Sequence, residues 1–251
     1  MIDDLPLQAS AFLILFARVG AVLMLLPLFS EEAVPGRIRL LTAFAMSLGL
    51  WGMLGPTVLP AAGDGNALAG ILVVELGVGL ALGMIVKLMF QAAVMGASIA
   101  SLQIGLSSAL IFDPSLGGQT PVLAKLVVLA ATLVCLALGL HHLWIGAIIR
   151  SYDLFPVGGV PNFSDFANLA VTTIGKAMSL AVSMAAPLLV YGIVFNVALG
   201  LSARLAPTIQ VFFIAQPLNL MLGISLFAMV VGTMITAFAA TMERWMQSGM
   251  S

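Results

Sequence analysis

The stretch ALAGILVVELGVGLALGMIVKLMFQAAVMGASIASLQI, residues Ala67 to Ile104, decides the fold. It holds two charges, Glu75 and Lys87. A helix that crosses a bilayer needs roughly 20 apolar residues, and a soluble helix needs a polar face, which this stretch lacks. As a straight helix it would be roughly 57 Å long, against a hydrocarbon core of about 30 Å. It must therefore project, bend or fold as a hairpin. Because its middle has no strong turn signal, we predict one long, bent helix.

The composition of the whole chain agrees with a membrane protein. Of 251 residues, 62% are hydrophobic and 8% are charged, whereas soluble domains carry about 25% charged residues. The formal net charge is −1 and the basic residues are scattered, so no nucleic-acid partner is predicted. A single cysteine, Cys135, excludes an intramolecular disulfide and a cysteine-based metal cluster.

Apolar runs and the breakers between them predict an all-α, polytopic membrane protein with a single domain over residues 1–251. About six long, partly broken helices are expected, arranged as helical hairpins. Their ranges are Leu7–Phe29, Arg39–Leu59, Leu68–Ile99, Val122–Ile149, Ala177–Gly200 and Val211–Ala240. The segment Tyr152–Asn168 has the composition of an aqueous loop, and Pro187, Pro207 and Pro217 are expected to break or bend the last two helices.

Three charges fall inside predicted spans: Arg18, Glu75 and Lys87. A charge at the centre of a membrane helix costs about 2.5–3.5 kcal/mol on insertion scales, so each needs a partner. Glu75 and Lys87 would lie about 18 Å apart along one helix and cannot pair. We therefore expect Arg18 to pair with Glu75 across helices. The pair would serve either an ion or proton pathway or the packing of the helices, and the scarcity of other polar groups favours packing.

The sequence gives little support for a metal site or a catalytic site. Gly79 and Gly83 form a Gly-x-x-x-Gly step, which is typical of closely packed membrane helices. The adjacent His141 and His142 would point about 100° apart on a helix, so no metal site is predicted. No serine or cysteine lies in a nucleophile motif such as G-x-S-x-G, and Asp113 is the only aspartate near a span. We expect neither catalysis nor a cofactor.

The stretch SLQIGLSSALIFDPSLGGQTP, residues Ser101 to Pro121, is too polar for lipid and too apolar for an ordinary exposed loop. Its prolines and glycines rule out a regular long helix. Irregular backbone at membrane depth survives only beside protein or a water-filled cavity. The stretch is therefore either an aqueous loop or a segment that lines or blocks a pore, and its composition alone favours the loop.

Several motifs, in order along the chain, give a family resemblance. They are Phe16-Ala17-Arg18-Val19-Gly20, Val34-Pro35-Gly36-Arg37, Glu75 with Gly79 and Gly83, Gln103-Ile104-Gly105, Asp113-Pro114, Leu140-His141-His142-Leu143-Trp144, and Arg204 with Pro207 and Pro217. The chain resembles the FliR family, called SctT in virulence systems, of the flagellar and type III secretion export apparatus. The resemblance covers almost the whole chain, and the order and spacing of the motifs are more specific than any one of them.

The resemblance implies a non-catalytic subunit of the flagellar protein export gate, in the basal body at the bacterial inner membrane. It implies FliP-like and FliQ-like partner subunits, an FlhB-like switch protein, membrane lipids, and unfolded exported proteins as cargo. It also implies that the stretch from Leu106 to Pro121 plugs the closed pore, with Leu110, Ile111 and Phe112 as an apolar stopper and Gly117-Gly118 as the flexible part. The alternatives are a small-solute secondary transporter and an assembly subunit without pore contact.

Overall fold

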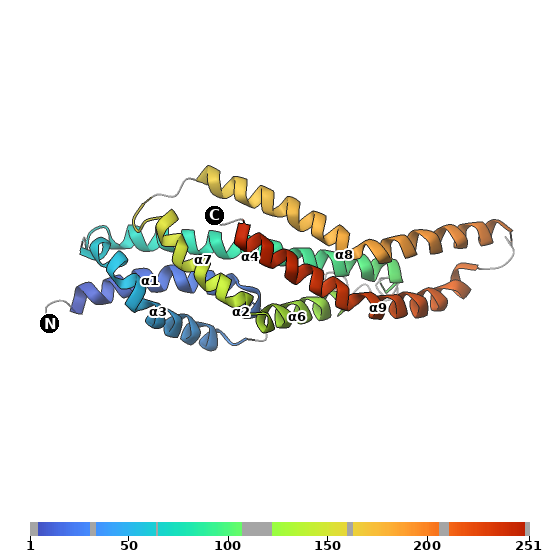
Figure 1. Ribbon diagram of the computed structural model, residues 1–251, viewed down its shortest axis with the longest axis horizontal. Coiled ribbons are helices and arrows are strands. Elements are labelled where there is room, and N and C mark those ends of the chain that lie inside the picture. Colours follow the sequence, from blue (N-terminus) through green and yellow to red (C-terminus); the bar gives the residue numbers. More distant parts are fainter. Residues whose placement is uncertain are drawn as a thin grey trace. The chain divides into compact units, whose positions relative to one another are not determined.

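The fold is helical throughout the part of the chain that the structure describes. The computed structural model describes residues 5–30, 34–63, 65–106, 122–159, 163–205 and 211–248, and in these ranges it contains no strands (Figure 1). The elements in order are α1 (Leu5–Leu25), α2 (Pro27–Ser30), α3 (Gly36–Val58), the 3-10 helix η1 (Leu59–Gly63), α4 (Leu68–Ile104), α6 (Val122–Ala137), α7 (Leu140–Leu154), α8 (Phe163–Leu205) and α9 (Val211–Ser248).

The helices are those of a polytopic membrane protein. Five of them are long and apolar enough to cross a bilayer, and α6 with α7 would supply a sixth crossing if together they form one broken span. This confirms the predicted fold class of about six long, partly broken apolar helices. The long third segment is confirmed as well, because α4 is continuous over 37 residues.

The ends of α4 and α6 are set by glycine. At Gly105 φ is +85°; its N–H donates to Leu102 O at 3.1 Å, and that of Leu106 donates to Ser101 O at 3.2 Å. These two bonds and the left-handed glycine form a Schellman motif, which ends α4. A second left-handed glycine, Gly139 with φ of +76°, lies directly before α7 and separates it from α6.

Other boundaries differ from the sequence prediction. The predicted helix Val122–Ile149 is two helices, because Gly139 interrupts it. The predicted loop Tyr152–Asn168 was wrong at both ends: α7 continues to Leu154 and α8 begins at Phe163. Asp165 in the first turn of α8 stabilises a helix N-terminus, so a polar residue that resembled a loop belongs to a helix start. The helices α8 and α9 continue through Pro187 and Pro217, whereas Pro207 lies outside the described residues.

The chain divides into two compact units. The first comprises the described residues of Met1–Leu88 and Gly139–Ile174. In it, α1 packs on α3 through a cluster of aromatic rings: Phe12 lies 5.2 Å from Phe44 and 5.9 Å from Trp51, measured between ring centroids. A Cβ on Gly20 would contact Ala43 at 3.8 Å. Because later residues of α1 meet earlier residues of α3, the two helices are antiparallel.

The second unit comprises the described residues of Met89–Leu138 and Gly175–Gly249. The last turn of α4 is closely enclosed by α8 and α9: the Gln103 side chain lies directly against Gly192, and Ile104 lies against Gly223. Tyr191 on α8 donates its hydroxyl proton to an oxygen of Asn219 on α9, with Oδ1 at 2.8 Å and the main-chain O at 3.0 Å. Within this unit, contacts with two glycines therefore enclose the end of α4, and a polar contact joins α8 to α9.

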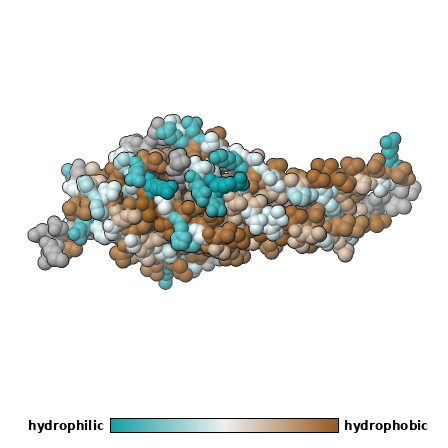
Figure 2. Space-filling model, in the orientation of Figure 1, coloured by the Kyte–Doolittle hydropathy of each residue, from teal (hydrophilic) through white to brown (hydrophobic). Residues whose placement is uncertain are grey.

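Much of the surface is apolar. Apolar residues cover much of the face drawn in Figure 2, between smaller groups of hydrophilic residues. Exposed side chains include Met229, Met221 and Val73, which are 80%, 71% and 70% exposed. In the most apolar window of α9 only 17% of the residues are buried. Surfaces of this kind need lipid or other protein chains to cover them.

Candidate functional site: a buried ion pair that joins three helices

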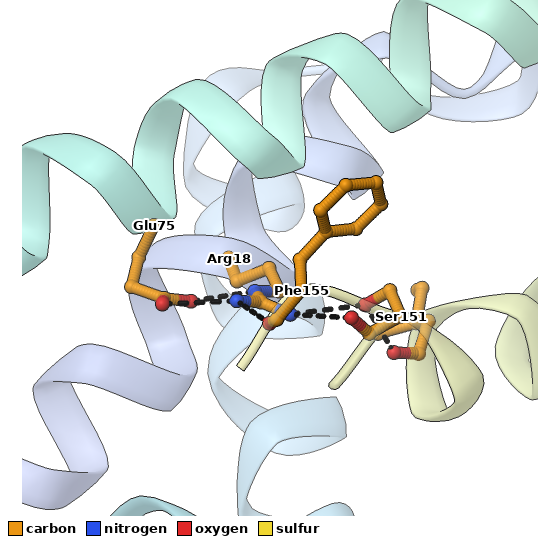
Figure 3. Close-up of polar contacts among 5 residues, drawn as sticks. Arg18, Glu75, Ser151 and Phe155 are labelled. Atoms are coloured by element: carbon orange, nitrogen blue, oxygen red, sulfur yellow. Dashed lines mark hydrogen bonds and ion pairs between the residues drawn. The ribbon is translucent and has the colours of Figure 1, made fainter. Parts of the chain in front are cut away.

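Arg18 and Glu75 form a buried ion pair in the first unit. Both side chains are completely buried, Arg18 on α1 and Glu75 on α4. Arg18 Nε donates to Glu75 Oε2 at 2.5 Å, and Nη2 donates to Oε1 at 2.9 Å, as Figure 3 shows. The two parallel bonds give the bidentate geometry in which guanidinium and carboxylate interact most strongly. The structure thus joins the two residues that the sequence singled out as partners.

The rest of the guanidinium is occupied by the end of α7. Nη1 donates to Ser151 O at 3.0 Å and lies 3.3 Å from Ser151 Oγ, and Nη2 donates to Phe155 O at 2.9 Å (Figure 3). With the two bonds to Glu75, these contacts supply an acceptor for each of the five N–H groups of an arginine. The ring of Tyr152 lies under the guanidinium, its centroid 4.0 Å from Cζ, in a cation–π contact.

The position of Arg18 suits the end of a helix. The last carbonyls of an α-helix have no partner within it and carry the negative end of its dipole. In α7, Ser151 O also accepts a hydrogen bond from the N–H of Phe155, the residue that ends the helix. Arg18 therefore neutralises Glu75 on one side and caps the carboxyl end of α7 on the other, which ties three helices together.

Glycine brings α1 and α4 close enough for the pair to form. Glu75, Gly79 and Gly83 are spaced four residues apart and share one face of α4. A Cβ on Gly79 would lie 2.5 Å from Arg18 O, and one on Gly83 would lie 2.8 Å from Leu25 Cβ. Side chains at these two positions would push α1 away. The glycine step and the ion pair are therefore parts of one helix contact.

The geometry favours packing over proton transport. A proton carrier must release its proton to water or to a chain of polar groups. Glu75 is completely buried, and both its oxygens are held by a guanidinium that stays charged in proteins. The other partners of Arg18 are two main-chain carbonyls and a hydroxyl that itself donates to Ile148 O at 2.6 Å. Such an arrangement holds helices in place, and we call it the arginine clamp: Arg18, Glu75, Ser151 and Phe155.

The remaining predicted residues do not join this site. Lys87 is exposed on α4. The plug residues Leu110, Ile111, Phe112, Gly117 and Gly118 lie outside the described residues. The rings of His141 and His142 lie 4.1 Å apart, and the part of the chain that was searched contains no group of three His, Cys, Asp or Glu side chains placed to hold a metal ion.

The contribution of α7 was not predicted from the sequence. Tyr152 was expected in a loop, and Ser151 and Phe155 were not expected as partners for Arg18. One signal was available, because helix C-termini attract cations. This signal identifies Ser151 and Phe155 only if the helix is known to end at Leu154.

Comparison with known proteins identifies the family. The family model described as "Bacterial export proteins, family 1" matches residues 9–245. The chain belongs to this family. Three similar proteins are each named "Flagellar biosynthetic protein FliR". The Caulobacter vibrioides protein is 38% identical over 216 residues, which is 86% of each chain. The Escherichia coli protein is 34% identical over 84% of this chain and 80% of its own, and the Bacillus subtilis protein is 30% identical over 84% and 82%.

These matches confirm the resemblance to the FliR family. They also put the clamp in context: all its members, from Arg18 to Phe155, lie within the matched region of this family-1 export protein.

Proposed function

We propose that this chain is a non-catalytic subunit of the flagellar, type III protein export gate in the bacterial inner membrane. It acts as one membrane domain over residues 1–251, together with FliP-like and FliQ-like subunits and an FlhB-like switch protein, and unfolded proteins are its cargo. Membership of a family of bacterial export proteins and the flagellar names of the relatives support this assignment.

The length of the apolar helices is the observation that carries an assembly role. Helices α4, α8 and α9 have 37, 43 and 38 residues, which correspond to about 55, 64 and 57 Å. On α8, exposed apolar side chains extend from Val171 to Leu205, about 51 Å along the axis. A hydrocarbon core covers about 30 Å. Apolar surface beyond it requires other protein, which favours a subunit of an assembly over a lone transporter.

The pore and its plug are the finer part of the proposal. The resemblance implies that Leu110, Ile111 and Phe112 close the conduit and that Gly117-Gly118 lets the segment move. A dry apolar constriction opposes ion leakage because an ion loses its hydration shell there without compensation. The described structure supports one element of this, since α4 ends at a glycine C-cap directly before the segment.

Within this assembly the arginine clamp has a packing role. It fixes α1, α4 and the end of α7 relative to one another. Because both charges are buried and paired, the clamp adds no net charge to the apolar interior.

Deletion of residues 110–119 tests the plug. In cells that carry the partner subunits, we expect the deletion to raise ion leakage across the inner membrane, measured as loss of membrane potential. The matched control keeps an apolar stopper by the conservative changes Leu110→Ile, Ile111→Leu and Phe112→Leu, and should stay sealed. Leakage at the wild-type level after the deletion would refute the plug.

Purification tests the assembly role. A tagged chain extracted from its native membrane in mild detergent should carry membrane subunits of the export apparatus with it. A chain recovered alone, which takes up a small solute in proteoliposomes, would instead support the transporter.

A further inference from the structure

One face of α4 in the first unit is exposed and apolar except for a single charge. Val73, Leu76, Leu80 and Met84 are 70%, 45%, 45% and 56% exposed, and Lys87 follows them on the exposed side. Their spacing of three or four residues places them in one stripe along the helix. This exposed stripe, Val73 to Lys87, differs from the face with Gly79 and Gly83, which packs on α1.

Lys87 lies near the middle of α4, far from both ends of the helix. It is 19 residues from Leu68 and 17 from Ile104, the bounds of α4, or about 28 and 26 Å along the axis. A lysine side chain is much shorter than that, so its ammonium group cannot extend past either end of the helix and stays beside the exposed apolar side chains of α4. Among the described residues it has no carboxylate within ion-pair distance. An unpaired ammonium group on an apolar helix is unfavourable in hydrocarbon and in a protein interface.

We propose that the exposed stripe is the docking face for an apolar helix of another membrane subunit, and that this helix bears one aspartate or glutamate whose carboxylate pairs with Lys87. The inference rests on the proposed assembly role. Charge complementarity selects the occupant: the partner helix must cover Leu76, Leu80 and Met84 with apolar side chains and present an anion one turn further along.

Water and lipid fit the stripe less well. Water at this face would leave three large apolar side chains hydrated beside Lys87. Lipid tails would cover those side chains and leave the ammonium group without an anion. Another basic side chain on an apolar helix, Arg18, is neutralised by a carboxylate within the chain.

A single ion pair in an apolar helix contact also fixes alignment. Apolar side chains tolerate sliding of one helix along another, whereas one buried charge pair is satisfied at one register. Lys87 would therefore determine where along α4 the partner helix sits as well as which helix binds.

Copurification of the export apparatus from native cells tests the inference with a series of variants. Lys87→Arg should assemble as wild type, because it keeps the charge. Lys87→Met should reduce the copurified partner, since it leaves the partner's carboxylate unpaired. Lys87→Glu should reduce it roughly tenfold or more, because two carboxylates would then face each other. The control Lys125→Glu makes the same charge change at an exposed residue in the first turn of α6 and should assemble normally.

Crosslinking identifies the occupant without altering Lys87. A photoreactive residue at Met84 should crosslink to a membrane subunit, and an Asp→Lys or Glu→Lys change in that subunit should restore assembly of the Lys87→Glu variant. Crosslinks to lipid alone or to exported protein would overturn the inference, as would normal assembly of both Lys87→Met and Lys87→Glu. The proposed function has its own test: it fails if the wild-type chain is purified from its native membrane without any other subunit of the export apparatus.

Discussion

At the scale of single residues, Arg18 shows what a charge needs in order to lie between apolar helices. It has a carboxylate, two helix-end carbonyls, a hydroxyl and an aromatic ring around it. The pairing with Glu75 could be predicted because few charges fall inside the spans. The carbonyl partners could not be predicted, because every residue has a main-chain carbonyl and the residue types do not show which ones are near Arg18. Their position depends on where α7 ends.

Removal of Glu75 alone should be more damaging than removal of both charges. Glu75→Leu leaves Arg18 buried without its anion and should destabilise the protein by about 3–5 kcal/mol. The double change Arg18→Met with Glu75→Leu should recover part of this loss, because no unpaired charge remains buried. It should not recover all of it, because the bonds from Arg18 to Ser151 O and Phe155 O are also lost. Thermal unfolding in detergent measures both, and equal loss in the single and double variants would contradict the clamp.

Close helix contact makes a second prediction at this scale. Gly79→Ala would place a methyl group 2.5 Å from Arg18 O and should cost about 1–3 kcal/mol. Gly77→Ala is the matched control two residues away, where a Cβ would meet none of the described atoms within 4 Å; it should be neutral or slightly stabilising. Similar unfolding temperatures for the two variants would argue against the tight contact of α1 with α4.

At the scale of elements, long apolar runs were predictable and their interruptions were not. The continuous helix α4 follows from the absence of turn signals between Leu68 and Ile104. The division between α6 and α7 depends on one glycine in a run that is otherwise apolar, and glycine is also common inside membrane helices. The start of α8 contains polar residues, and a polar stretch at the start of a helix has the same composition as a loop.

Gly139 should therefore be sensitive to substitution. Gly139→Ala must adopt φ of +76°, which costs an L-residue about 1–2 kcal/mol, or else α6 and α7 must rearrange. Gly146→Ala in the middle of α7 is the control, since a Cβ there would meet none of the described atoms within 4 Å. For a chain of this size we expect Gly139→Ala to lower the midpoint of thermal unfolding by about 2–8 °C. An unchanged midpoint would count against a conformational role for this glycine.

At the scale of the whole molecule, exposed apolar surface is the dominant property. Composition predicted a membrane protein, and the family motifs predicted an assembly. Neither could say which helix faces are covered within the chain, because lipid-facing, partner-facing and core positions are all apolar in the sequence. The structure separates them: Met242 is completely buried, whereas Met221 and Met229 are 71% and 80% exposed.

Methionine oxidation can show whether partners cover these faces. Mild peroxide should oxidise Met221 and Met229 in the isolated chain in detergent and spare Met242, because oxidation follows exposure. In the assembled export apparatus, Met221 and Met229 should become protected. Peptide mass spectrometry gives the extent at each site, and equal oxidation of Met221 and Met229 in both samples would mean that no subunit covers α9 there.

The complete burial of Arg18 and Glu75 has a consequence for handling the protein. Salt ions weaken attraction between charges that they can approach, with a Debye length of about 3 Å at 1 M, and they screen buried pairs much less. We expect a wash in concentrated salt to detach proteins held by surface charge while the unfolding temperature of this chain stays the same. Ionic strength thus becomes a tool for stripping the membrane preparation without loosening α1 from α4.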